Sequence, residues 1–397
     1  MGMTSGVRGA TAERVRMLPG DGVLALLRKG RVPGVVDLAA GTPEAPHPPA
    51  ELVEAACAAL RAGFNQYGDP AGYAGLRSQI AASLTTAADP DTEITVTVGA
   101  TEAMAVALLS TVDPGDEVVV LEPCFDNFLG AVSLTGATPR FVRLHAPDWR
   151  FDPAELEAAF TPRTRAVIVN TPNNPTGRMF DEDELSLLAE LCERWNATVI
   201  SDEVYAAFAF DRPHLSVADV PSLRDRAIVI GSLSKSHAVS GWRIGYLRAN
   251  AAMTDVLRRM HIAATGFAVS PLQQAVVSTG LLDRAAWDPA PELKGLRDRA
   301  VTMLTEAGLT CTAPEGGCYV LAGIRTVTEL GSHRFAEQLL ERRKVLVVPG
   351  TAFYGDAGHG DRFVRVAFNR QPHTLDEAAA RLTREQVPVR VDSTPST

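Results

Sequence analysis

Short apolar runs alternate with helix-like stretches through the middle of this chain, from Ile94 to Leu247. The run Ile94 to Val98 alternates as a strand and leads through Gly99-Ala100-Thr101 into a helical stretch that ends near Val112. Strands that alternate with helices form a mostly parallel sheet, because each helix carries the chain back across one face. The pattern therefore predicts an α/β fold in which helices cover both faces of the sheet.

Length and composition limit the number of domains and the classes of partner. The chain has 397 residues, which exceeds one ordinary core and fits a large domain plus a smaller one. Hydrophobic residues make up 46% and charged residues 21%, so the chain has enough apolar surface to form a globular protein. The formal net charge of -9 argues against nucleic acid or an anionic membrane surface as a partner.

The cysteines and histidines do not suggest a metal site. The five cysteines are scattered and odd in number, and the eight histidines form no ligand cluster. We therefore predict reduced thiols and no metal. The first thirty residues lack the apolar segment of a secretory signal, and no apolar run is long enough to span a bilayer. These features predict a cytoplasmic protein.

A single lysine, Lys235, stands among small hydroxyl residues just after the apolar run Ala227 to Ile230. A desolvated lysine has a lowered pKa and can form a Schiff base with a carbonyl. Ser232, Ser234 and Arg243 nearby offer the donors and the charge that a phosphate dianion needs. A lysine in a serine-rich turn is usually a solvated surface residue, so its interpretation depends on the other motifs.

Three further motifs accompany the lysine segment: Asn170 to Gly177, Ser201 to Tyr205, and Phe363 to Phe368. In this order, the four motifs resemble the class I and II aminotransferases of the fold type I pyridoxal-phosphate enzymes. The resemblance runs from about Leu38 to Phe368. It implies a seven-stranded-type sheet sandwiched by helices, and a smaller α/β domain formed by the N-terminal arm and the C-terminal third.

The resemblance also implies where the domains begin and end. Residues 1–44 would form the arm and part of the small domain, 45–285 the large cofactor-binding domain, 286–388 the small domain and 389–397 a loose tail. Within the small domain, the sequence predicts a helix from Phe335 to Arg342 and one strand from Val345 to Val348. The working unit would be a homodimer.

The cofactor implied by the family is pyridoxal 5'-phosphate, carried by Lys235 as a Schiff base. Asp202 follows a buried strand, where a carboxylate is costly unless it is paired. The resemblance assigns it to the protonated ring nitrogen, and a structural salt bridge is the alternative. Tyr205 and Asn174 would hydrogen-bond the ring oxygen.

The remaining cofactor contacts also follow from the resemblance. Phe125 would stack on the ring, with core packing as the alternative. Tyr67 would reach across the dimer to the phosphate of the neighbouring subunit. The phosphate would otherwise be held by the start of one helix and by the lysine segment, that is, by Ala100, Thr101, Ser232, Ser234 and Arg243.

Three residues would bind the substrate. Gly41 would approach the carboxylate through its backbone, and Asn174 would reach it with its amide. Arg365 lies in an apolar run that predicts a central strand of the small domain, where an unpaired guanidinium is costly. The family supplies the substrate α-carboxylate as its partner. An internal Asp or Glu partner is the alternative.

The reaction that the resemblance implies is ping-pong transamination between an L-amino acid and a 2-oxo acid. The amino acid would be neutral, aromatic or non-standard, since no second arginine can be assigned to a dicarboxylic substrate. The same residues would serve a C–S β-lyase or an oxidase. A non-catalytic relative is a further alternative, although Lys235 is present.

Overall fold

The computed structural model describes residues 32–383, together with residues 12, 14, 15, 18, 26, 28 and 30. The predicted tail at 389–397 and most of the predicted arm lie outside the described residues. None of the described helices combines the length and the hydropathy that a membrane-spanning segment needs.

The larger sheet has eight strands in the order β2-β9-β8-β7-β6-β3-β4-β5. The five strands from β4 through β3, β6 and β7 to β8 are parallel, while β9 runs antiparallel to both β8 and β2. The predicted mostly parallel sheet is therefore confirmed, and the two-residue β5 adds a short antiparallel edge. The strands are β2 (Ile94–Thr97), β3 (Glu117–Glu122), β4 (Thr138–His145), β5 (Arg150–Phe151), β6 (Thr164–Asn170), β7 (Thr198–Asp202), β8 (Ala227–Ser232) and β9 (Gly245–Arg248).

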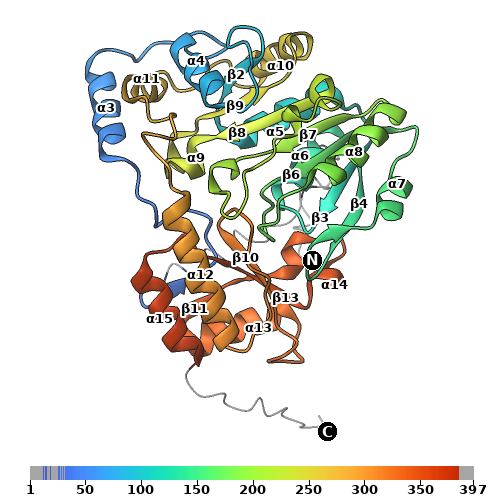
Figure 1. The fold of residues 1–397 in the computed structure, drawn as a ribbon, viewed down its shortest axis with the longest axis vertical. Helices are drawn as coiled ribbons and strands as arrows, with labels where there is room; N and C mark the ends of the chain where they lie inside the picture. The colour runs from blue at the N-terminus through green and yellow to red at the C-terminus, as the bar shows by residue number, and fades with distance from the viewer. Residues whose placement is uncertain are drawn as a thin grey trace.

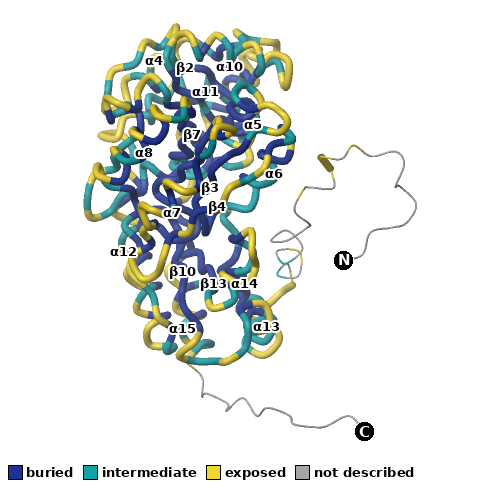
Figure 2. The backbone as a smooth tube through the Cα atoms, turned by 90° about the vertical axis from the view of Figure 1, so that its right-hand side faces the viewer, coloured by how far each residue is buried: buried dark blue, intermediate teal, exposed yellow. Residues whose placement is uncertain are grey.

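Helices cover both faces of this sheet (Figure 1). They are α3 (Ala50–Arg61), α4 (Ala74–Ser83), α5 (Gly99–Thr111), α6 (Asn127–Thr135), α7 (Pro153–Ala159), α8 (Glu182–Trp195), α9 (Leu233–Ser236), α10 (Ala251–Ala264) and α11 (Ser270–Thr279). Val119 and Leu121 of β3 share a core with α7 and α8, whereas Val118 and Val120 share another with α5, α6 and α10. The strands are apolar on both sides because both sides are covered. Figure 2 shows this buried backbone through the middle of the molecule.

The helix α8 illustrates how local sequence sets an element. Asp181 accepts a hydrogen bond from the Glu184 amide, and Glu184 accepts one from the Asp181 amide, which makes a capping box. Leu185, Leu188 and Cys192 recur at helical spacing and are all buried against the sheet.

The C-terminal third forms a second region, in orange and red at the bottom of Figure 1. Its elements are α12 (Ala290–Glu306), β10 (Tyr319–Gly323), α13 (Ser332–Gln338), η5 (Leu339–Arg343), β11 (Val345–Leu346), β12 (Val348–Pro349), η6 (Gly350–Phe353), α14 (Ala357–Gly360), β13 (Phe363–Ala367) and α15 (Pro372–Thr383). The strand β1 (Val36–Asp37) pairs parallel with β11, so the N-terminal segment joins this region as predicted.

Two local predictions in this region need correction. The strand predicted at Val345 to Val348 is two strands, because β11 pairs with β1 while β12 pairs with β13. Pro349 lacks an N–H and occupies the edge strand of its sheet, where no donor is missed. The helix predicted to start at Phe335 begins at Ser332 and ends in one π-helical segment, η5.

Candidate active site

A cavity of about 550 Å³ opens at the carboxyl ends of the central strands, between the large sheet and the second region. Asn170, Asp202 and Ser232 line it from the ends of β6, β7 and β8, and Arg365 lines it from β13. The predicted site residues that line the cavity are Gly41, Ala100, Thr101, Phe125, Asn174, Asp202, Tyr205, Ser232, Ser234, Lys235, Arg243 and Arg365. Tyr67 does not line it.

Lys235 enters the cavity from α9, the short helix directly after β8. Its Nζ donates a hydrogen bond to the Gly41 carbonyl oxygen at 2.7 Å. Burial lowers the pKa of the amine, and the nearby charges of Arg365 and Arg370 lower it further. A neutral amine is the nucleophile that Schiff-base formation requires, and it is also the form that can accept a proton.

Asp202 is a buried carboxylate with few neighbouring groups that stabilise its negative charge. Its side chain accepts one hydrogen bond, from the Val204 amide at 3.2 Å, and it has no ion pair among the residues that the structure describes. Burial raises the pKa of Asp202 to about 7. A cation bound in the cavity would lower that pKa again, so this environment suits the protonated nitrogen of a pyridine ring.

The start of α5 and the residue Arg243 form an anion-binding corner. The guanidinium of Arg243 lies against Gly99, where φ is +75° and an added Cβ would meet it. Its Nη1 donates to the Ser240 carbonyl at 3.0 Å, and Arg243 itself has a left-handed φ of 55°. The helix N-terminus and this arginine together suit a phosphate.

Ser232 and Ser234, which line the cavity with Arg243, differ in whether their hydroxyl hydrogen is free for a ligand. Ser232 caps α9 by accepting from the Ser234 amide, and its hydroxyl can donate to the Ile244 carbonyl at 2.9 Å. Its single hydroxyl hydrogen therefore has a protein acceptor. The two hydroxyl oxygens lie 2.9 Å apart, so when the Ser232 hydrogen is donated to Ile244, the Ser234 hydroxyl can donate its hydrogen either to Ser232 or to a bound anion.

On the side of the cavity that the second region forms, Arg365 is 3% exposed at the centre of the sheet β10-β13-β12. Its guanidinium donates to Asn174 Oδ1 at 3.0 Å and to the Ala39 carbonyl at 2.8 Å. It also lies over the Tyr319 ring, 4.1 Å from the centroid. No carboxylate pairs with it among the described residues, and its Nε has no hydrogen-bond partner there. A buried guanidinium in this state is suited to an anionic ligand.

Comparison with known proteins places this geometry in a family. The model of the family "Aminotransferase class I and II" matches residues 33–382. The chain belongs to the class I and II aminotransferases. It is thereby a transaminase of a family that depends on pyridoxal phosphate.

Several relatives cover most of this aminotransferase. The probable N-succinyldiaminopimelate aminotransferase of Mycobacterium tuberculosis is 36% identical over 88% of this chain and 92% of the relative. The putative aminotransferase YugH of Bacillus subtilis is 34% identical over 88% and 91%. A solved structure of the M. tuberculosis N-succinyldiaminopimelate aminotransferase matches with a TM-score of 0.89 at 34% identity, covering 94% of this chain and 99% of that one.

Some lining residues of the aminotransferase were missed by sequence reasoning, among them Tyr319, Leu18 and Asn127. The Tyr319 hydroxyl lies 3.5 Å from that of Tyr205. The structure pairs Leu321 with Arg365, so Tyr319, two residues earlier, lies on the same face of the sheet as Arg365. The sequence alone does not contain this pairing, and Leu18 belongs to an N-terminal segment without a strong periodic pattern.

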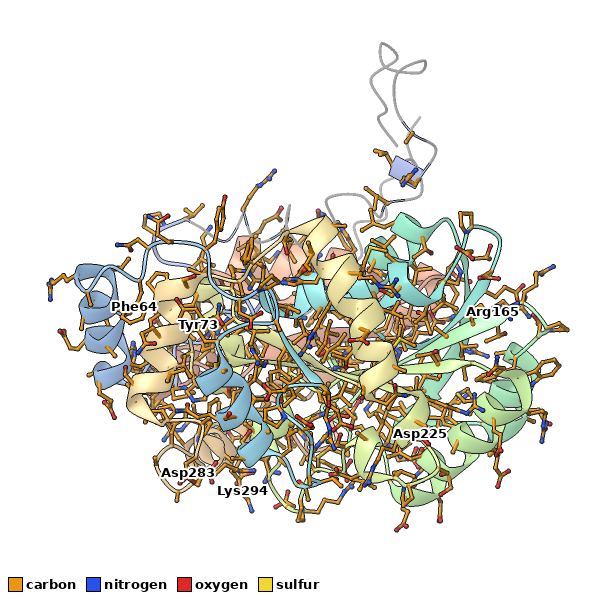
Figure 3. The ribbon with its side chains drawn as sticks, turned by 90° about the horizontal axis from the view of Figure 1, so that it is seen from above. Phe64, Tyr73, Arg165, Asp225, Asp283 and Lys294 are labelled. Carbon is orange, nitrogen blue, oxygen red and sulfur yellow. The ribbon has the colours of Figure 1, made fainter. Side chains whose placement is uncertain are left out.

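Two aromatic residues of the prediction differ in their placement. Phe125 lines the cavity and meets Phe128 edge to face, with ring centroids 5.8 Å apart. Tyr67 is 86% exposed and stacks on Phe267 outside the cavity. Phe64 on the same loop is also exposed and lies near Tyr73 (Figure 3).

Proposed function

We propose that this aminotransferase binds pyridoxal 5'-phosphate in the cavity and moves the α-amino group of an L-amino acid to a 2-oxo acid by a ping-pong mechanism. One observation carries the proposal. Lys235, Asp202, Arg243 and Arg365 line the same cavity, and none forms an ion pair with another described residue. The amine of Lys235 can react with an aldehyde, and the charges of Asp202, Arg243 and Arg365 complement a pyridinium, a phosphate and an α-carboxylate.

Each residue then has a distinct task. When bound, the cofactor supplies an electrophilic carbon and a ring that withdraws electrons from the substrate Cα. Arg365 and Asn174 bind the substrate α-carboxylate and orient the Cα–H bond. Lys235 accepts the α-proton and later returns a proton, which its lowered pKa favours. Asp202 keeps the ring nitrogen protonated, and Ser234, Arg243 and the start of α5 hold the phosphate.

We propose a neutral, aromatic or non-standard amino donor. The only cationic residues of the described chain that line the cavity are Lys235, Arg243 and Arg365, and all three have the tasks given above. No further cation remains for a side-chain carboxylate. Relatives carry varied names: one is kynurenine–oxoglutarate transaminase 3 of Mus musculus, 30% identical over 92% of this chain and 88% of the relative. Another, YbdL of Escherichia coli, is titled a methionine aminotransferase and matches at a TM-score of 0.89 with 29% identity, covering 94% and 99%.

We also propose a homodimer in which Tyr67 contacts the phosphate of the neighbouring subunit. Its 86% exposure, away from the cavity of its own chain, supports this assignment. The domain boundaries and the cytoplasmic location stay predictions.

Product analysis tests the proposed reaction. Cofactor-loaded protein is incubated with a panel of amino donors and pyruvate, and oxo acid, alanine, ammonia and oxygen are measured. Transamination predicts one alanine for each donor oxo acid, without ammonia release or oxygen uptake. Ammonia with cleavage of a C–S bond would make the protein a β-lyase, and oxygen uptake would make it an oxidase.

A further inference from the structure

Five side chains with a full charge line the active-site cavity on the part of the chain that the structure describes: Asp126, Asp202, Lys235, Arg243 and Arg365. Four of them have a counterpart in the cofactor or in the α-carboxylate that is common to all amino acids. Asp126 is the fifth charged residue. Its carboxylate has no counterpart in the cofactor or in any group that every substrate shares.

Asp126 is not occupied by an evident structural task. It directly precedes α6, a position where Asp usually caps the helix, but its φ and ψ are -55° and -31° and its side chain makes no capping hydrogen bond. It forms no ion pair with any residue from 32 to 383. Burial raises the pKa of Asp126, whereas the charge of Arg365 and the amides of Asn127 and Asp126 itself lower it. The half-buried carboxylate therefore lines the cavity within electrostatic reach of Arg365.

The walls near Asp126 are otherwise neutral. Phe125 and Phe128 flank it in the chain, and Asn127 adds an amide to the same lining. A substrate whose α-carboxylate lies on Arg365 must direct its side chain past a surface with one negative charge and no free cation. An anionic side chain would be repelled there, and a cationic or N–H-bearing side chain would be attracted.

We propose that Asp126 selects the amino donor by the charge of its side chain, favouring cationic and N–H-bearing side chains and discriminating against side-chain carboxylates. This assignment rests on the proposed function, because it takes Arg365 as the site of the α-carboxylate. Asp126 is a specificity residue: it acts on the distal part of the substrate and has no part in moving the α-proton.

Pairs of amino acids with nearly equal shape provide the test. Glutamine and glutamate differ by one negative charge, and arginine and citrulline differ by one positive charge. For each donor, the single-turnover rate constant and the Kd are measured on cofactor-loaded protein by the change in cofactor absorbance. Their ratio gives a specificity constant even for slow donors.

The wild-type protein is expected to prefer glutamine over glutamate by roughly tenfold or more, and arginine over citrulline by a smaller factor. Asp126→Asn should move both ratios most of the way to one, mainly by improving glutamate and weakening arginine, while phenylalanine changes little. Asn127→Asp adds a carboxylate to the same lining and should increase the preference for glutamine over glutamate. Asp113→Asn removes the same charge from an exposed position outside the cavity lining and should change neither preference.

The inference would be overturned by equal changes for all donors in Asp126→Asn, or by unchanged preferences in that variant. A wild type that converts phenylalanine but none of the four paired donors would also overturn it. If wild-type protein converts no donor at all, the proposed function itself fails.

Discussion

At the scale of single residues, burial turns ordinary side chains into functional groups. Asp202 is 8% exposed and has a pKa of about 7, compared with an ordinary value of 3.8, because its charged form has lost water. Lys235 shows the converse effect, since burial favours its neutral form. Asp202 ends β7 and Lys235 lies in α9, the short helix directly after β8, so their position in the fold imposes these environments.

The raised pKa of Asp202 predicts a pH-dependent stability in the cofactor-free protein. Between about pH 4 and pH 7 the folded state holds a proton on Asp202 that the unfolded state has released, so stability falls as pH rises through this window. The full change corresponds to at most about 4 kcal/mol. Urea unfolding measured at pH 5 and at pH 7.5 gives the loss in unfolding free energy as the pH rises. This loss should be smaller in Asp202→Asn than in the wild type. Glu203, another buried carboxylate with a raised pKa, is present in both proteins. An identical loss in the two proteins would contradict the account.

Substitution of Arg365 should weaken substrate binding. Arg365→Lys keeps the charge but removes the planar pair of donors, so kcat/KM for amino donors should fall roughly 30- to 100-fold, mainly through KM. Steady-state kinetics with several donors measures this. Arg362→Lys, at an exposed position just before β13, is the matched control and should leave both constants unchanged. A loss confined to kcat would argue against carboxylate binding by Arg365.

Sequence reasoning at this scale succeeded where chemistry made a residue conspicuous. An aspartate at the end of an apolar strand and an arginine inside an apolar strand are costly unless they are paired, and the motifs that accompany Lys235 set it apart from a solvated lysine. Tyr319 and Asn127 are ordinary residues in their local sequence, and only their tertiary position makes them part of the cavity. Asp126 likewise has no marked local pattern, and the structure shows that it lines the cavity and that its side chain makes no cap to α6.

At the scale of elements, the N-terminus of α5 is shaped by a close approach. Gly99 has a φ of +75°, and Gly245 of the neighbouring β9 lies so close that an added Cβ would meet the Gly99 backbone. The absence of side chains at these two positions lets Arg243 and the first amides of α5 face the same corner of the cavity. The phosphate-binding geometry is therefore a property of two elements together.

A pair of glycine substitutions tests this corner. Gly99→Ala would place a methyl group against the Arg243 guanidinium, so affinity for pyridoxal phosphate should fall at least tenfold. Gly115→Ala introduces the same strain at a φ of +92°, but nothing lies within 4 Å of its added Cβ. Both variants should lose about 1 kcal/mol of stability from backbone strain. Equal cofactor affinities, measured by equilibrium titration, would contradict this role of α5.

The elements themselves could be predicted from periodicity, but their pairing could not. The apolar strands and the helix α8 were evident in sequence because both faces of the sheet and one face of the helix are buried. The antiparallel insertion of β9 between β2 and β8 depends on contacts distant in sequence. The division of residues 345–349 between two sheets likewise depends on which partner strands are near.

At the scale of the whole molecule, exposed apolar side chains gather on the segment from α3 to the loop that follows it. Val53, Leu60, Phe64 and Tyr67 are 40%, 49%, 37% and 86% exposed. Exposed apolar side chains that form a contiguous patch mark interaction surfaces, whereas single ones are common on monomers. The position of Val53, Leu60 and Phe64 on the same segment as Tyr67 agrees with the proposed dimer.

Mixing two impaired variants tests whether Tyr67 acts across that dimer. Tyr67→Ala should weaken cofactor binding in the neighbouring site, and Lys235→Ala should inactivate its own site. In a hybrid dimer, one site would contain an intact Lys235 from one chain and an intact Tyr67 from the other. Co-refolding the two variants should therefore restore activity above the sum of the separate proteins. If Tyr67 served its own chain, no site in the mixture would be intact and no activity would return.

The most direct measurement of the central claim is a single turnover of cofactor-loaded wild type and Lys235→Ala with a reactive amino donor in the absence of oxygen. We predict one equivalent of oxo acid per site from the wild type, and recovery of the original absorbance when a second oxo acid is added. Lys235→Ala should still bind the cofactor and the donor but form oxo acid several orders of magnitude more slowly, with partial rescue by a small primary amine. Oxo acid formed at the wild-type rate by Lys235→Ala would contradict the assignment of Lys235 as the group that moves the α-proton.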